Sequence, residues 1–191
     1  LAPTPRDGAP AISFAQQRLW FLDQWQPGSP QYNIAAAVRL TGPLDRGALE
    51  ASLRAVVQRH EALRTTFTAR DGKPVAQITD SVDFDLRYLE LSDLPPDTRE
   101  PEWKRLASEE ARRPFDLASG PLLRAMVLQL ANDAHVVVVV MHHIASDGWS
   151  IGILNRELAT HYSAFVASRP CPLPPLPLQY ADFADWQRRW L

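Results

Sequence analysis

Apolar and polar residues follow two different repeats along the chain, and the change of repeat separates helices from strands. Several segments place apolar residues every three or four positions, which is typical of a helix with one buried face. The predicted helices span residues 13–25, 45–60, 98–113, 149–166 and 179–190. Shorter runs rich in β-branched and apolar residues predict strands at 33–40, 64–69, 74–79, 84–91, 122–130 and 135–141. This alternation indicates an α/β fold.

Two of these segments say more about the sheet. The strand at 135–141 contains five consecutive valines, and an unbroken run of β-branched residues predicts a strand that is buried on both faces. The dipeptide Asp71-Gly72 lies between two other predicted strands and is typical of a hairpin turn. We therefore expect the sheet to be at least partly antiparallel.

Prolines separate the last predicted helix from the rest of the chain. They make up 17 of the 191 residues, and their densest cluster lies within residues 170–178. Such a segment cannot form a helix or a central strand, so it is predicted to be an extended connector. The alternative is a polyproline segment that a partner recognises.

Charge and cysteine content exclude several classes of protein. The chain has 20 Lys+Arg against 22 Asp+Glu and a net charge of −2, so it has no basic field for nucleic acid or for an anionic membrane. The lone Cys171 excludes an internal disulfide and suits a reducing compartment such as the cytoplasm. The chain runs from Leu1 to Leu191 without an initiator methionine, and we expect it to be a piece of a longer protein.

The candidate chemistry lies directly after the valine strand, in the segment His142-His143-Ile144-Ala145-Ser146-Asp147-Gly148. Adjacent residues at a strand end point to opposite faces, so we expect one histidine to face a cleft and the other the interior. Ser146 or Asp147 could cap the following helix. Gly148 would let the backbone approach a ligand closely. A histidine, a backbone donor and a helix N-terminus together suit the oxyanion intermediate of an acyl transfer.

The same residues also have simpler interpretations. A histidine after a buried strand is commonly a hydrogen-bonded structural residue, and a glycine is commonly only a turn residue. A zinc site is disfavoured because the side chains of adjacent histidines diverge and no cysteine is near. Cys171 is a poor nucleophile because nothing beside it in the sequence would lower the pKa of its thiol. His60, His135 and His161 look like surface or packing residues.

A second cluster, residues 59–67 (RHEALRTTF), lies where a predicted helix passes into a strand. Cationic side chains at the end of a helix are ordinary. An arginine buried in the strand would instead require a carboxylate partner, for which Asp147 is the attractive candidate.

These segments together resemble the condensation domains of nonribosomal peptide synthetases. The segment MHHIASDGWS (141–150) is similar to their HHxxxDG motif, which is also found in chloramphenicol acetyltransferase-like enzymes. Further blocks resemble condensation domains in the expected order, at 13–22, 59–67, 115–125 and 180–187. The resemblance implies a chloramphenicol acetyltransferase-like α/β sandwich, with helices packed on a mixed, largely antiparallel sheet. It also implies the N-terminal (donor) lobe (1–169), the connector (170–178) and a helix (179–191) that begins the crossover to a missing C-terminal lobe.

The resemblance assigns roles to individual residues. His143 matches the catalytic histidine, and His142 matches a structural one. Asp147 matches an aspartate that pairs with an arginine of the 59–67 block, and Arg64 matches that arginine. The candidates for the wall of the substrate tunnel are Gly148, Trp149 and Ser150.

The activity that the resemblance implies is amide bond formation between a donor thioester and an acceptor amine. Both substrates would arrive on phosphopantetheine arms of peptidyl carrier proteins, with no metal or other cofactor bound by the lobe itself. The expected partners are the donor and acceptor carrier proteins, the missing C-terminal lobe and an adenylation domain. The intact histidines and aspartate differ from the heterocyclisation type, and the opening block together with HHIASDGWS resembles the subtype that joins two L-residues. The alternatives are a non-catalytic module that interacts with carrier proteins or the partner lobe and can self-associate, or a free-standing acetyltransferase that uses coenzyme A.

Overall fold

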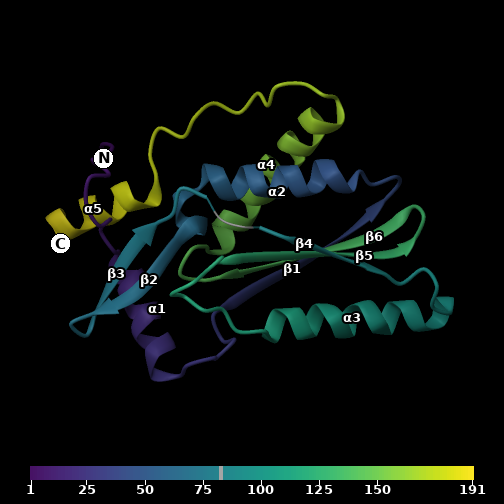
Figure 1. Ribbon diagram of the computed structural model, residues 1–191, viewed down its shortest axis with the longest axis horizontal. Coiled ribbons are helices and arrows are strands. Elements are labelled where there is room, and N and C mark those ends of the chain that lie inside the picture. Colours follow the sequence, from purple (N-terminus) through teal and green to yellow (C-terminus); the bar gives the residue numbers. More distant parts are fainter. Residues whose placement is uncertain (82–83) are drawn as a thin grey trace.

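The computed structural model describes residues 1–81 and 84–191, and within them a four-stranded mixed sheet organises the chain (Figure 1). The strand order is β1-β6-β5-β4, with the β1–β6 and β5–β6 pairs antiparallel and the β4–β5 pair parallel. These strands are β1 (Asn33–Thr41), β4 (Leu86–Glu90), β5 (Leu123–Ala131) and β6 (Ala134–His142). The expected mixed and largely antiparallel sheet is confirmed.

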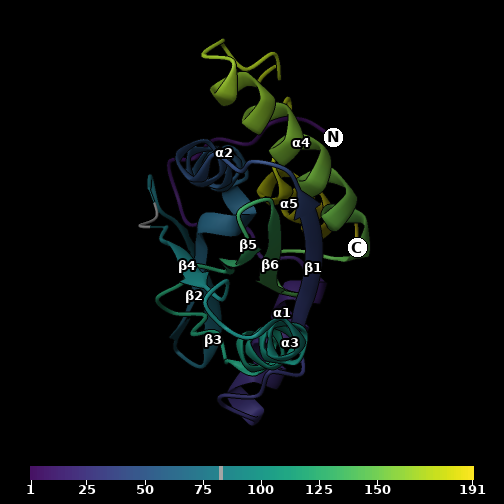
Figure 2. The same cartoon turned by 90° about the vertical axis from the view of Figure 1, so that its right-hand side faces the viewer.

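Helices cover both faces of this sheet (Figure 2). Helices α2 (Arg46–Arg59) and α4 (Gly148–Val166) pack against each other on one face. Helix α3 (Pro96–Arg112) covers the other face together with side chains of α1 (Phe14–Trp25). The helices and strands predicted from the sequence are all present, with bounds that differ by at most two residues. Within the described residues, no helix is both long and apolar enough to cross a membrane.

The valines of β6 are buried on both faces, as their unbroken run predicts. Val136, Val138 and Val140 belong to the core beneath α1 and α3, where Leu19 and Trp20 contribute from α1. The intervening valines belong to the second core, beneath α2 and α4. Because successive residues of a strand point to opposite faces, one continuous apolar run supplies both cores.

The predicted hairpin forms, but it does not belong to the main sheet. Strands β2 (Thr65–Arg70) and β3 (Lys73–Ile78) make a separate two-stranded sheet. Its turn places Asp71 at φ 52° and Gly72 at φ 72°, the left-handed region that such tight turns require. The antiparallel character of the main sheet therefore comes from β1, β5 and β6 and not from this hairpin. A 3-10 helix, η1 (Glu61–Arg64), leads from α2 into β2.

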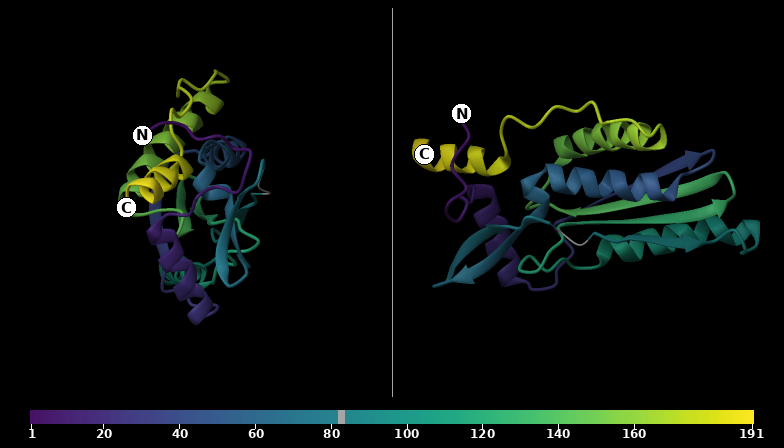
Figure 3. Two further views of the ribbon diagram at one scale, coloured as in Figure 1. Left: turned by 90° about the vertical axis from the view of Figure 1, so that its left-hand side faces the viewer. Right: turned by 45° about the horizontal axis from the view of Figure 1, so that its top comes forward.

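The proline-rich segment contains neither helix nor strand between α4 and α5 (Tyr180–Trp190). It runs back along the layer of α2 and α4, so that α5 lies beside the N-terminal arm (Figures 1 and 3). Thr4 and Arg6 anchor this arm, because both donate hydrogen bonds of 2.8 Å to the buried Asp182 carboxylate of α5. The two ends of the chain are thereby brought together.

Candidate active site at the end of strand β6

The two adjacent histidines face opposite ways, as predicted for the end of a strand. His142 is only 2% exposed, and its Nδ1 accepts a 3.1 Å hydrogen bond from the backbone N–H of Ile144. Its ring meets Phe115 and Tyr32 edge-on, with centroids 5.9 and 6.4 Å away. Burial, and to a smaller extent the charge of His143, lowers the pKa of His142 to about 4. His142 is therefore a neutral side chain built into the core.

His143 is exposed and held in one orientation. Its backbone N–H donates to the carbonyl oxygen of Tyr32 at 2.8 Å, and its Nδ1 lies 2.7 Å from the carbonyl oxygen of Ser146. A carbonyl oxygen can only accept, so Nδ1 must carry the hydrogen. The neutral ring then has its lone pair on Nε2, for which the described part of the chain supplies no partner. Nε2 is thus available to accept a proton from a ligand.

Asp147 caps helix α4. Its carboxylate accepts hydrogen bonds from the backbone N–H of Ser150 at 2.8 Å and from the Ser150 hydroxyl at 2.6 Å. These bonds lower the pKa of Asp147 despite some burial, which keeps it ionised. The negative carboxylate already occupies the positive end of the helix. Stabilisation of an oxyanion by that helix end, which the sequence suggested, is therefore weakened by the cap.

The candidates for the tunnel wall lie at the start of α4. Gly148 is exposed, and a Cβ atom placed on it would meet nothing within 4 Å. Trp149 is 81% exposed. Ser150 is half-buried and lines a cavity of about 150 Å³ together with Ser146, His60 and Tyr180. The cavity therefore lies between the loop at residues 142–147, the block at residues 59–67 and α5.

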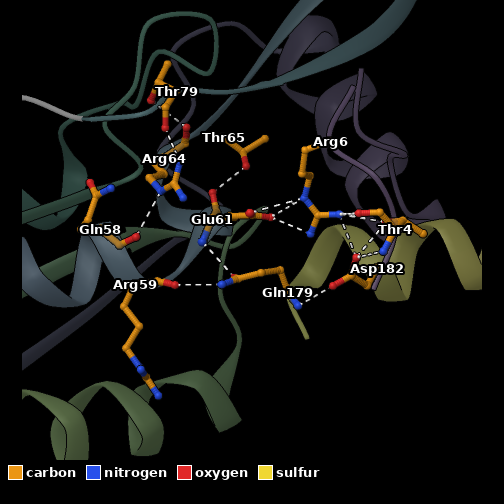
Figure 4. A network of polar contacts seen from close by, with 10 residues as sticks. All are labelled: Thr4, Arg6, Gln58, Arg59, Glu61, Arg64, Thr65, Thr79, Gln179 and Asp182. Atoms are coloured by element: carbon orange, nitrogen blue, oxygen red, sulfur yellow. Dashed lines mark hydrogen bonds and ion pairs between the residues drawn. The ribbon is translucent and has the colours of Figure 1, made fainter. Parts of the chain in front are cut away.

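The structure does not bring Arg64 and Asp147 together. Arg64 lies in η1 instead of in a strand, and it is half-buried. Its guanidinium donates to the carbonyl oxygens of Gln58, at 3.3 Å, and of Thr79 (Figure 4). Backbone carbonyls at the ends of α2 and β3 satisfy this arginine, so it requires no carboxylate partner.

A different ion cluster joins the second block to α4. The buried carboxylate of Glu157 accepts from Arg59 Nε at 3.2 Å and lies 2.7 Å from His60 Nε2. Burial alone would raise the pKa of Glu157, but the hydrogen bonds and charges of His60 and Arg59 outweigh burial and lower it. Sequence reasoning missed Glu157 and took His60 for a surface or packing residue. The one available signal was a carboxylate within the apolar stripe of α4, between Leu154 and Leu158.

No group of three or more His, Cys, Asp or Glu side chains within residues 1–81 and 84–191 is arranged to hold a metal ion.

Proteins of similar sequence include a gramicidin synthase and a tripeptide synthetase. One of the linear gramicidin synthase proteins of Brevibacillus parabrevis is 51% identical over 191 residues, which is 100% of this chain and 2% of that protein. The phosphinothricin tripeptide synthetase of Streptomyces viridochromogenes is 48% identical over 185 residues, which is 97% of this chain and 17% of that protein. The chain thus spans a small part of the length of these relatives.

Solved structures of similar fold also extend beyond this chain. The X-domain from teicoplanin biosynthesis is 34% identical with a TM-score of 0.87, over 98% of this chain and 40% of that one. The starter condensation domain of rhizomide synthetase has the same fold, with a TM-score of 0.87 at 23% identity over 96% of this chain and 44% of that one. The model of the condensation-domain family matches residues 7–191. The chain therefore belongs to the condensation-domain family.

Proposed function

We propose that this chain is the N-terminal lobe of a condensation domain that forms an amide bond between a donor acyl thioester and an acceptor amine. The lobe comprises residues 1–169. Residues 170–178 connect it to the helix within 179–191, which begins the crossover to a second lobe. The observation that carries the proposal is the orientation of His143. Its Nδ1 hydrogen is held by Ser146 and its Nε2 is free to accept, in a chain matched by the family over residues 7–191.

The reaction requires one proton to move while one bond forms and another breaks. The acceptor nitrogen attacks the thioester carbonyl carbon, which forms the C–N bond; the C–S bond then breaks and the donor thiol leaves. The nitrogen loses a proton that the departing sulfur gains. His143 Nε2 can take this proton and return it, because the Ser146 carbonyl keeps the hydrogen of the neutral ring on Nδ1. An α-amine with a pKa of about 8 is already partly neutral near pH 7, so orienting it is the main demand on the histidine.

The partners follow from this chemistry and from the length of the relatives. Donor and acceptor would be attached to phosphopantetheine arms of peptidyl carrier proteins and would enter as substrates. The second lobe and an adenylation domain would belong to the same synthetase. Because the chain spans only 40% of a matched solved chain, we expect the 191 residues alone to lack condensation activity.

The test is His143→Ala in the longer synthetase, with both carrier proteins loaded and the dipeptidyl product measured by mass spectrometry. Loss of a general acid–base group should lower the rate about 100-fold or more. The side chain is exposed, so the urea midpoint should not change, and this serves as the control for folding. Product formation at the wild-type rate would refute the role of His143.

One comparison favours a second function, that of a docking module. In another solved structure the teicoplanin X-domain forms a complex with OxyB. That X-domain chain is 31% identical in sequence to this one, with a TM-score of 0.88. This chain exposes large aromatic side chains that a partner would cover, including Trp25 at 72%, Trp149 at 81% and Trp190 at 73%. Sedimentation of the isolated chain tests self-association through these surfaces. A strictly monomeric chain whose parent protein loses activity with His143→Ala would favour the catalytic function.

A further inference from the structure

The side-chain amide of Gln16, in the block at residues 13–22, contacts the loop that carries the two histidines (residues 142–147, here called the histidine loop). Gln16 is 5% exposed and Ser13 is fully buried. The backbone N–H of Gln16 donates to the Ser13 hydroxyl at 3.1 Å, and the Ser13 N–H donates to Gln16 Oε1 at 3.0 Å. This reciprocal pair caps helix α1. It uses only the oxygen of the amide side chain and leaves Nε2 for another partner.

That partner is the histidine loop itself. Gln16 Nε2 donates to the backbone carbonyl of Ile144 over a long 3.4 Å. Two hydrogen bonds within the loop end on the His142 carbonyl, one from the N–H of Ala145 and one from the hydroxyl of Ser146. The backbone N–H of His143 donates outside the loop, to the carbonyl of Tyr32. Among the described residues, Gln16 is thus a side chain from a distant helix that binds a backbone carbonyl of this loop.

The position of this loop decides the state of His143. The Ser146 carbonyl that holds the Nδ1 hydrogen lies two residues after the carbonyl that Gln16 holds. If the loop turned, the Ser146 oxygen would leave Nδ1 and the imidazole would lose its preference for one tautomer.

We propose that Gln16 is a positioning residue for His143, which acts by holding the Ile144 carbonyl so that the lone pair of the neutral imidazole stays on Nε2. The importance of this for catalysis rests on the proposed function. The tautomer itself can be measured without any activity.

Two variants separate this role from helix capping. Gln16→Glu keeps an acceptor oxygen for the Ser13 N–H, and glutamate is a good capping partner at this position. At neutral pH it has no hydrogen to donate to Ile144. Ser13→Ala does the reverse, because it removes the hydroxyl of the cap and leaves Gln16 Nε2 in place. The matched control is Gln17→Glu, the same change at the next residue, which is exposed and whose Oε1 only accepts from Arg188.

The readout is the ¹⁵N chemical shifts of the His143 ring, measured in this chain well above the ordinary histidine pKa of about 6.5. The wild type, Gln17→Glu and Ser13→Ala should show a single Nδ1–H tautomer. Gln16→Glu should show a mixture of tautomers. In the longer synthetase, Gln16→Glu should lower kcat at least tenfold and leave KM unchanged. A wild-type tautomer in a folded Gln16→Glu variant would overturn the proposal.

The experiment keeps two failures apart. A shifted tautomer together with full activity of His143→Ala would overturn the proposed function and leave the positioning role of Gln16 standing. If the buried charge unfolds Gln16→Glu, then Gln16→Met replaces it. Gln16→Met removes both the cap and the donor, and a tautomer equal to that of Ser13→Ala would refute the role of Nε2.

Discussion

Replacing Glu157 by glutamine tests the ion cluster that joins α4 to the end of α2. Glu157→Gln keeps the size of the side chain and some hydrogen bonding, but it removes the negative charge that pairs with Arg59 and accepts from His60. The glutamate side chain is 9% exposed, against 15% for Arg59 and 24% for His60. The variant therefore leaves the Arg59 guanidinium partly buried without this counter-charge.

The expected cost follows from this burial. Breaking a fully buried ion pair on one side costs about 3–5 kcal/mol. Water reaches the Arg59 side chain, which is 15% exposed, and screens part of that cost, so we expect about 2–3 kcal/mol. For a chain of this length such a loss lowers the melting temperature by roughly 4–12 °C.

The assay is urea unfolding of the wild type and the variant, with Glu109→Gln as the matched control. Glu109 pairs with Arg105 on the surface of α3, where both side chains are more than half exposed, so its replacement should not move the midpoint. Because the pKa of Glu157 is lowered in the folded state, the stability it adds is complete above its unfolded pKa of about 4.3 and declines below that pH. A midpoint of Glu157→Gln equal to that of Glu109→Gln would refute the reasoning.

Two further changes concern the histidine motif. The pKa of His142 is lowered from 6.5 to about 4 by burial and by the charge of His143, so the stability of the wild type should be complete above pH 6.5 and should decline as the pH falls toward 4. His142→Phe should flatten this decline in urea midpoints, and a variant that follows the wild-type curve would contradict the burial argument. Gly148→Ala should leave the midpoint unchanged, because its Cβ meets nothing within 4 Å. A fall in condensation rate in that stable variant would indicate a ligand against this position, and an unchanged rate would exclude close approach there.

Local patterns sufficed for the helices and strands, for the burial of β6 and for the opposite facing of the two histidines. The valine run of β6 predicted burial on both faces, and the structure distributes those valines between two cores. The alternation of a strand end predicted one interior histidine and one exposed histidine, as found for His142 and His143. Such patterns depend on residues a few positions apart, because the geometry of the backbone dictates where successive side chains point.

The partners of the polar groups were decided by the tertiary structure. The sequence suggested Asp147 as the carboxylate partner of Arg64. In the structure Arg64 donates to two backbone carbonyls, and Asp147 caps the N-terminus of α4. The cluster that does join these elements pairs Arg59 with Glu157, 98 positions away. A hydrogen bond needs its two atoms within about 3 Å, and no local repeat records which atoms a fold brings that close. The sequence by itself therefore determined the elements, the burial of β6 on both faces and the resemblance to the family, whereas only the tertiary structure decided which groups hold the ring of His143 in its observed orientation.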